Sequence, residues 1–79
     1  MNKSKLTKKT VKHENIELHQ IEAISTFGAI KKGEKGGWVE KEKNLSQTGN
    51  AWVSGNAWVS GDARVFGDAR VFGDARVSG

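Results

Sequence analysis

A six-residue repeat that begins at Gly49 constrains the fold of this 79-residue chain more than any other feature. The units read Gly-Asn-Ala-Trp-Val-Ser twice, Gly-Asp-Ala-Arg-Val-Phe twice and Gly-Asp-Ala-Arg-Val-Ser once, and Gly79 starts another. Five consecutive units of one short period are typical of stacked supersecondary units that bury a shared core. The sequence therefore predicts a parallel β-solenoid over residues 49–79.

Each unit has the chemistry of a short strand followed by a corner. Alanine and valine lie two positions apart, so they face the same side of an extended strand. Glycine and the Asn or Asp after it tolerate the positive φ angles that tight corners need. We expect the valines to point inward and the alanines to fit beside the corners. These are Val53, Val59, Val65, Val71 and Val77, with Ala51, Ala57, Ala63, Ala69 and Ala75.

The pattern resembles the hexapeptide-repeat family of left-handed parallel β-helices, in which an inward aliphatic residue is followed four positions later by a small one. Val53 with Ala57 and Val59 with Ala63 are two of the matching pairs. The resemblance implies about 18 residues per coil, and hence about two coils here. That coil length places Trp52 under Arg70, Trp58 under Arg76, Asn50 under Asp68 and Asn56 under Asp74. The alternative is that the two tryptophans form an exposed binding surface.

The two ends of the solenoid are expected to differ. In the phase of the repeat, Leu45 and Val39 fall in the alanine position, so residues 37–48 are predicted to be an imperfect capping coil. The repeat reaches Gly79 undiminished, and a bare strand edge invites pairing. We therefore expect a homo-oligomer through the C-terminal end. Its predicted interface residues are Phe66, Phe72, Val71 and Val77.

Residues 1–36 are predicted to form a separate basic β module. Thr7 to Lys12 and Ile16 to Ile24 suit two strands of a hairpin around a turn at residues 13–15. A helix over residues 14–25 is the rival, because Leu18, Ile21 and Ile24 also suit helical spacing. The fold class expected for the whole chain is therefore all-β, a short hairpin module followed by a small left-handed β-helix.

Catalytic and metal-binding classes find little support in the sequence. There is no cysteine, and two histidines, His13 and His19, do not make a structural zinc site. We expect no cofactor. Acyltransferases of the hexapeptide-repeat family need a histidine base near the repeats, and both histidines lie in the N-terminal module. We therefore predict a non-enzymatic protein and keep an acyltransferase remnant as an alternative.

The net charge of +4 arises entirely from residues 1–48, which hold ten lysines and six glutamates. Basic arms bind nucleic acid or acidic protein surfaces, although many are only solvated tails. Because residues 1–26 contain no aromatic residue for base stacking, we expect only nonspecific binding of nucleic acid. The predicted partner-binding residues are Lys8, Lys9, Lys12, Lys31, Lys32, Lys35, Trp38, Trp52 and Trp58.

The stretch from Leu18 to Gln47, with Phe27-Gly28, Gly36-Gly37-Trp38-Val39 and Asn44-Leu45-Ser46-Gln47, is similar to small phage- and prophage-encoded hexapeptide-repeat proteins. That resemblance implies a protein of the bacterial host cytoplasm. It leads to the hypothesis of an inhibitor of a bacterial defence complex, such as a CRISPR nuclease. A self-assembling structural piece of a phage is the alternative. No apolar run reaches membrane-spanning length, so no membrane partner is expected.

Overall fold

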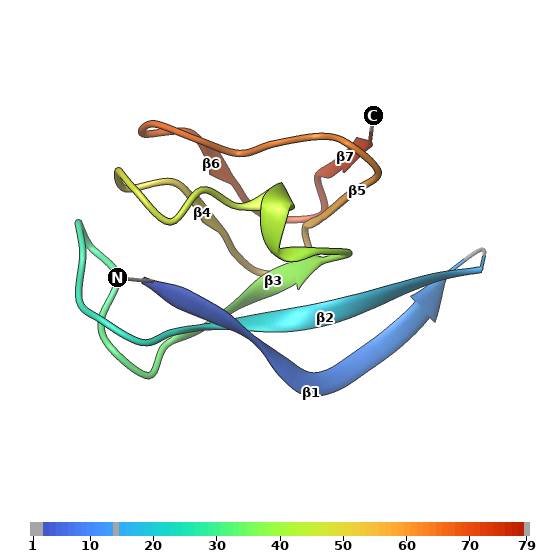
Figure 1. Cartoon of the computed structure of the whole chain (residues 1–79), viewed down its shortest axis with the longest axis horizontal. Coiled ribbons are helices and arrows are strands. Elements are labelled where there is room, and N and C mark those ends of the chain that lie inside the picture. The colour runs from blue at the N-terminus through green and yellow to red at the C-terminus, as the bar shows by residue number, and fades with distance from the viewer. Residues whose placement is uncertain (1–2, 14, 79) are drawn as a thin grey trace.

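The computed structural model describes residues 3–13 and 15–78, which form an all-β chain with a mixed sheet. A five-stranded sheet has the order β1-β2-β3-β5-β7, and β4 and β6 form a separate pair (Figure 1). The described residues contain no α-helix, only a short 3-10 turn, and no helix among them is long and apolar enough to cross a membrane. The elements are β1 (Ser4–His13), β2 (Ile16–Ala23), β3 (Lys35–Val39), η1 (Glu42–Asn44), β4 (Trp52–Val53), β5 (Trp58–Ser60), β6 (Arg70–Val71) and β7 (Arg76–Ser78).

The N-terminal module is an antiparallel hairpin of β1 and β2, which confirms the predicted strands and shows that the helical alternative was wrong. Asn15 adopts a φ of 70° at the turn, a conformation that asparagine tolerates better than most residues. β2 lies between β1 and β3 in the sheet, and it carries buried apolar residues on both of its faces. Leu18 on one face and Ile21 on the other are each 1% exposed.

β3 joins the antiparallel hairpin to the parallel part of the molecule. On one side it pairs antiparallel with β2, and on the other it pairs parallel with β5. β7 then adds in parallel to β5, so that Trp58 lies beside Arg76 and Val59 beside Val77. In Figure 1 these strands rise in order from the hairpin at the bottom to β7 near the C-terminus.

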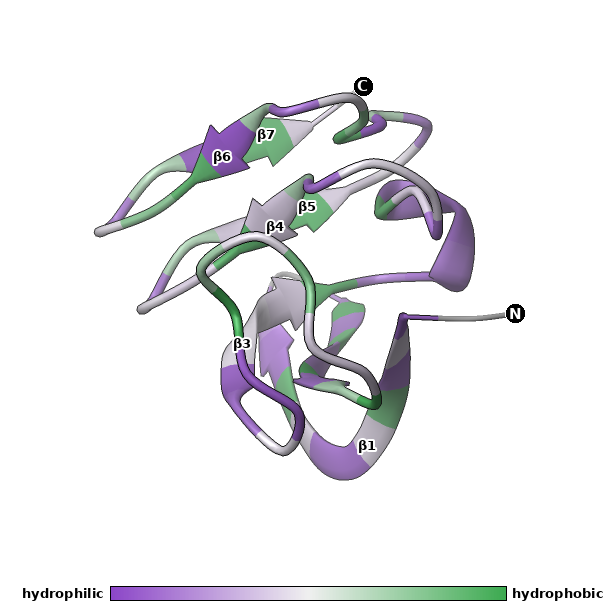
Figure 2. Cartoon of the chain, turned by 90° about the vertical axis from the view of Figure 1, so that its left-hand side faces the viewer, coloured by the Kyte–Doolittle hydropathy of each residue, from purple (hydrophilic) through white to green (hydrophobic). Residues whose placement is uncertain are grey.

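The repeat region returns to the same position every 18 residues, as the coil length predicted. β4 pairs in parallel with β6, which places Trp52 beside Arg70. The corners follow the same register, because the backbone N–H of Asn56 donates to the carbonyl of Gly73 at 3.0 Å. Figure 2 shows the strands β6 and β7 lying directly above β4 and β5. We call residues 61–78, which carry β6 and β7, the last layer.

The expected phase of residues 37–48 was wrong. Val39 pairs with Val59 and Leu45 with Val65, so both occupy the inward valine position and neither takes the alanine position. The spacing at these two places is 20 residues, because two extra residues lie between Leu45 and Val53. An unbroken six-residue count cannot detect such an insertion, whereas the parallel pairing shows it directly.

The core lies between the strands of the repeat region and β2. Val39, Val53 and Val59 are fully buried, while Val71 and Val77 of the last layer pack against the core but remain half-buried. This gradient follows from the layering, since the described residues place nothing above the last layer. The inward prediction thus holds for the valines, but the tight alanine packing is lost at Ala69 and Ala75, which are exposed.

Two side chains replace backbone donors where the regular stacking is incomplete. In the repeat, the carbonyls of Gly67 and Ala69 accept hydrogen bonds from backbone N–H groups of the layer below, at 3.0 and 3.2 Å. The equivalent carbonyls of Gly61 and Ala63 accept instead from the side-chain amide of Asn44, at 3.2 and 2.8 Å. The side chain of Asn44 therefore substitutes for a strand at this corner.

Lys3 performs the same substitution at the bottom of the repeat region. Its ammonium donates to the carbonyls of Gly49 and Ala51, at 3.2 and 2.7 Å, and lies 4.6 Å from the centre of the Phe27 ring. Burial lowers the pKa of Lys3, because desolvation disfavours the charged form. Lys3 belongs to the lysine-rich N-terminal segment that was expected to be a basic arm, but the structure shows that it is a buried cap, 5% exposed.

Candidate interaction surfaces

The upper edge of the last layer is a row of strand segments with one open side. Ala69 and Val71 turn their carbonyls toward β4, where Trp52 and Ser54 donate to them at 3.2 and 2.8 Å. In a parallel ladder alternate residues bond to opposite neighbours, so the peptide groups of Arg70 face away from β4. Among the described residues no strand pairs on that side of β6 or β7. The edge can therefore accept a further strand.

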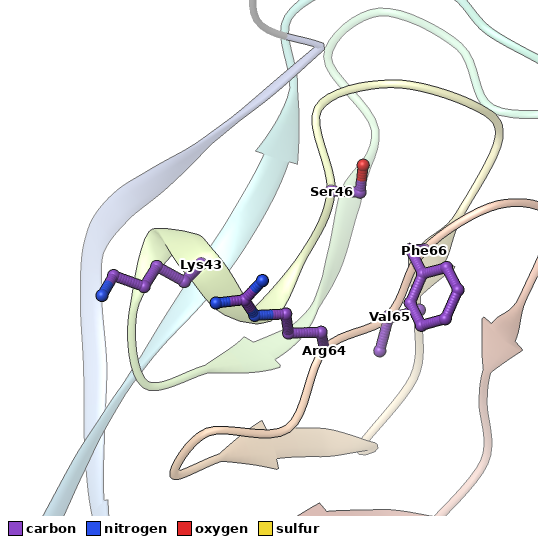
Figure 3. Close-up of a pocket in the computed structure, with 5 residues that line it drawn as sticks. All are labelled: Lys43, Ser46, Arg64, Val65 and Phe66. Atoms are coloured by element: carbon purple, nitrogen blue, oxygen red, sulfur yellow. The ribbon is translucent and has the colours of Figure 1, made fainter.

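The predicted interface residues all belong to the last layer, where Phe66 and Phe72 border two different pockets. Phe66 and Phe72 are each 68% exposed, and Val71 and Val77 lie half-buried beside the open edge. Phe66 borders a surface pocket of about 410 Å³ that also includes Lys43, Ser46, Arg64 and Val65. In Figure 3 the two cationic side chains occupy one side of this pocket, and Phe66 and Ser46 the other. Exposed aromatic rings on a small protein favour an interface.

The opposite end of the parallel strands is closed. β2 occupies the outer edge of β3, so no further strand can pair with β3 there. The ammonium of Lys3 occupies the carbonyls of Gly49 and Ala51, and the side chain of Gln47 accepts from the backbone N–H of Lys3 at 2.8 Å. Among the described residues, the parallel stack is therefore open at its C-terminal end and covered at the other.

The three tryptophans of the predicted partner surface have different environments. Trp38 and Trp58 are half-buried and adjacent in the β3–β5 register. Trp52 was expected to face outward, but it is only 3% exposed, because Phe27 packs against it edge-on with ring centroids 5.4 Å apart. Its Nε1 has no hydrogen-bond partner among the described residues. Trp52 is thus a core residue, and its burial does not favour the predicted role in binding a partner.

The structure separates the predicted lysines into two groups, one on β1 and one around the loop that leads into β3. Lys8, Lys9 and Lys12 are exposed on β1, where an irregular register between Leu6 and Thr10 bends the strand (Figure 1). Lysines and bulges are common on edge strands, where they discourage aggregation. The position of these lysines therefore has a structural explanation as well as a functional one.

Lys31, Lys32 and Lys35 lie in and after the loop that leads into β3 and are exposed (Figure 1). Lys35 is not free, because its ammonium lies 2.9 Å from the carboxylate of Glu22. The hydrogen bond from Lys35 is the main cause of a lowered pKa at Glu22. Only Lys12 of the six predicted lysines lies near Trp38 and Trp58.

The two histidines lie in different surroundings, and neither belongs to a metal-binding cluster among the described residues. The described residues contain no group of three or more His, Cys, Asp or Glu side chains that could hold a metal ion. His19 lies 3.6 Å from Glu17 on the hairpin. His13, however, reaches the repeat region, with its ring 5.1 Å from that of Trp58. Sequence spacing could not reveal that contact, because 45 positions separate the two residues.

Comparison with known proteins gives one partial match and no family assignment. No protein-family model matches the chain. A segment of 39 residues, 49% of the chain, is 46% identical to part of the uncharacterized acetyltransferase YdcK of Escherichia coli (strain K12). The match spans 12% of that relative's length. The chain is therefore similar to a small portion of a much longer protein.

Proposed function

We propose that residues 37–78 form a short solenoid of the hexapeptide-repeat type, and that the chain is a non-enzymatic protein-interaction module that self-associates through its last layer. The observation that carries this proposal is the open parallel edge beside Phe66 and Phe72, each 68% exposed. Pairing this edge would satisfy strand peptide groups and remove both aromatic rings from water, and burial of apolar surface contributes about 25 cal/mol per Å².

The geometry favours a closed dimer. β2 and Lys3 cover the lower end of the parallel stack, and the other free edge of the sheet, β1, carries exposed lysines and an irregular register that discourage pairing, so the open edge of a second copy is the favoured partner. Two identical edges that meet in this way are related by a two-fold axis, so their strands run antiparallel across the contact. The last layer carries Asp62, Asp68 and Asp74 against Arg64, Arg70 and Arg76, so two copies meet without net repulsion. An open polymer, the structural alternative, would need the last layer to pair with β1, the other edge of the five-stranded sheet.

Light scattering coupled to size-exclusion chromatography tests this self-association on the 79-residue chain. The 79-residue chain is used because further repeat units in a longer chain would cover the same edge. We expect a molar mass that levels off at twice the monomer value as concentration rises. Replacing Phe66 and Phe72 together by Glu should return the chain to a monomer, because carboxylates would be buried in the contact.

The matched control is Val11→Glu, which introduces one carboxylate at an exposed valine of β1, the strand at the opposite edge of the five-stranded sheet from β7. It should leave the dimer mass unchanged. A wild-type chain that stays monomeric at millimolar concentration would end the proposal. A mass that keeps rising with concentration would favour the polymer.

The target of such a module stays a prediction. We retain the hypothesis that a phage-derived chain of this kind inhibits a bacterial defence complex, such as a CRISPR nuclease, in the host cytoplasm. It rests on the resemblance of residues 18–47 to small phage-encoded proteins. If the exposed lysines of β1 make the contact, inhibition should be lost when Lys8, Lys9 and Lys12 are replaced by Glu.

A second candidate function, part of an acyltransferase, is favoured by the similarity to YdcK. In this case the chain, alone or within a longer protein, would contribute to binding of an acyl donor, and His13 would be the histidine nearest the repeat region. Isothermal titration calorimetry with acetyl-CoA tests this directly. We expect no heat of binding to the 79-residue chain, whereas saturable binding that is lost in His13→Ala would favour the enzyme.

A further inference from the structure

A second pocket lies between the free end of the hairpin and the outer face of β3, β5 and β7. It has a volume of about 310 Å³, within the range of ordinary ligand sites. Its walls come from segments far apart in the sequence: the end of β1, the start of β2, and the outward residues of the repeat region. The pocket is remote from the open edge that the proposed self-association uses, except at Arg76.

The floor of this pocket is apolar. Leu18 is 1% exposed, and Trp38 and Trp58 are half-buried against it. Val11, in the cross-strand position opposite Leu18, is 43% exposed although it borders the same pocket. An exposed valine beside a buried leucine and two indoles leaves room for an apolar side chain from another molecule.

The indole of Trp58 is held in place before any ligand arrives. The guanidinium of Arg76 lies over the ring, 5.2 Å from its centre, and the imidazole of His13 packs at 61° to it. These two contacts fix the ring and cover much of it. Nucleobases bind aromatic platforms by stacking on a free ring face, so the arrangement favours an aliphatic or aromatic protein side chain that enters between the indoles and Val11.

The rim of the pocket is positively charged. Lys12 and Arg76 both border it, and no carboxylate among residues 3–13 and 15–78 lies within 4.0 Å of either cation. Glu17 is the cross-strand neighbour of Lys12, but it lies against His19 at 3.6 Å. Cations around an apolar floor complement an acidic segment that carries one apolar anchor, since opposite charges at the rim steer association.

We propose that this pocket is a docking site for an acidic segment of a partner protein, with one apolar or aromatic side chain inserted between Val11, Trp38 and Trp58. This inference goes beyond the self-association and does not depend on it, because the residues that carry it lie on the hairpin and on the side of the sheet. It assigns a role to two of the three predicted tryptophans and to Lys12.

The test uses a short fluorescein-labelled peptide of aspartates and glutamates around one central phenylalanine, titrated with the full chain and followed by fluorescence anisotropy. Replacing the central phenylalanine by alanine should weaken binding at least about tenfold, as expected for a buried aromatic anchor. Lys12→Glu and Val11→Glu should each weaken it by about tenfold as well, because one reverses a rim charge and the other places a carboxylate in the pocket.

Lys31→Glu is the matched control, since Lys31 is an exposed lysine at the other end of the hairpin module. It should leave the affinity within about twofold, the size expected for a remote surface charge. Equal binding of the alanine peptide, or equal loss in Lys31→Glu, would reduce the effect to general electrostatics and overturn the proposal. Tighter binding of a labelled thymidine oligonucleotide, lost in Lys12→Glu, would identify a nucleic-acid site instead.

The proposed self-association and the proposed docking site can be tested independently of each other. Val11→Glu is expected to keep the dimer mass and to lose the peptide, whereas the double substitution at Phe66 and Phe72 is expected to lose the dimer and keep the peptide. A nuclear magnetic resonance spectrum of each variant shows that it remains folded, so that loss of binding can be attributed to the pocket.

Discussion

Replacing Gly37 with alanine is expected to destabilise the protein strongly. A Cβ at this position would lie 2.5 Å from the carbonyl oxygen of Ala57 and 2.7 Å from a methyl group of Val53. The first of these is backbone, which cannot rotate away. Overpacking of this kind costs about 3 kcal/mol, a large fraction of the stability of so small a domain. Urea unfolding followed by tryptophan fluorescence measures the loss.

Gly33→Ala separates steric crowding from backbone strain. No atom lies within 4 Å of a Cβ built at Gly33, but the φ of this residue is +92°, a backbone conformation that is unfavourable for alanine. We expect a loss of about 1 kcal/mol from strain alone. If the two substitutions cost the same, close packing of β3 against the repeat region does not explain why glycine is needed at position 37.

Asn44→Asp is expected to have the second large effect, because it removes the side-chain NH2 group that donates two hydrogen bonds and leaves the size of the side chain nearly unchanged. The side-chain NH2 of Asn44 donates to the carbonyls of Gly61 and Ala63, and its Oδ1 accepts from the backbone N–H of Lys41 at 2.7 Å. The residue is 1% exposed. A carboxylate there keeps the acceptor but places negative charge against two carbonyl oxygens. We expect a loss of about 3 kcal/mol in the free energy of unfolding.

Asn50→Asp is the matched control, since Asn50 occupies an exposed corner position and the repeat itself carries Asp at the corners of its later units. It should change the unfolding free energy by less than about 0.5 kcal/mol. Lys3→Met examines the same capping device at the other corner, and should be destabilising because the carbonyls of Gly49 and Ala51 lose their donor. Unchanged stability in both Asn44→Asp and Lys3→Met would show that water satisfies these carbonyls.

The repeat determined the local structure and much of the register without any knowledge of the fold. Its period of six residues, with valine and alanine two apart, required strands that alternate inward and outward side chains. The resemblance to a known repeat added the 18-residue spacing, and the pairing of Trp58 with Arg76 followed from it. The hairpin was predicted from Thr, Val and Ile runs around a turn, but the spacing of Leu18, Ile21 and Ile24 left a helix open until the pairing of β1 with β2 decided between them.

The candidate sites were only partly accessible from the sequence. Exposure of Phe66 and Phe72 followed from their place in the hexad, since each takes an outward position in an extended strand. The burial of Trp52 did not, because Phe27, in a loop with no repeat, covers the outward face there. Periodicity says which way a side chain points from its own strand, but it says nothing about what another segment places over it.

The sequence by itself determined that residues 49–78 are short, stacked strands with an inward row of valines, because a strict period leaves one side for a shared core. Only the tertiary structure decided the rest. The parallel pairing revealed that two extra residues lie between Leu45 and Val53. The fold also made Lys3 and Asn44 donors to backbone carbonyls, and it brought His13 against Trp58. Each of these contacts joins residues at least 17 positions apart. Such contacts are set by where the chain returns in space, which no local pattern records.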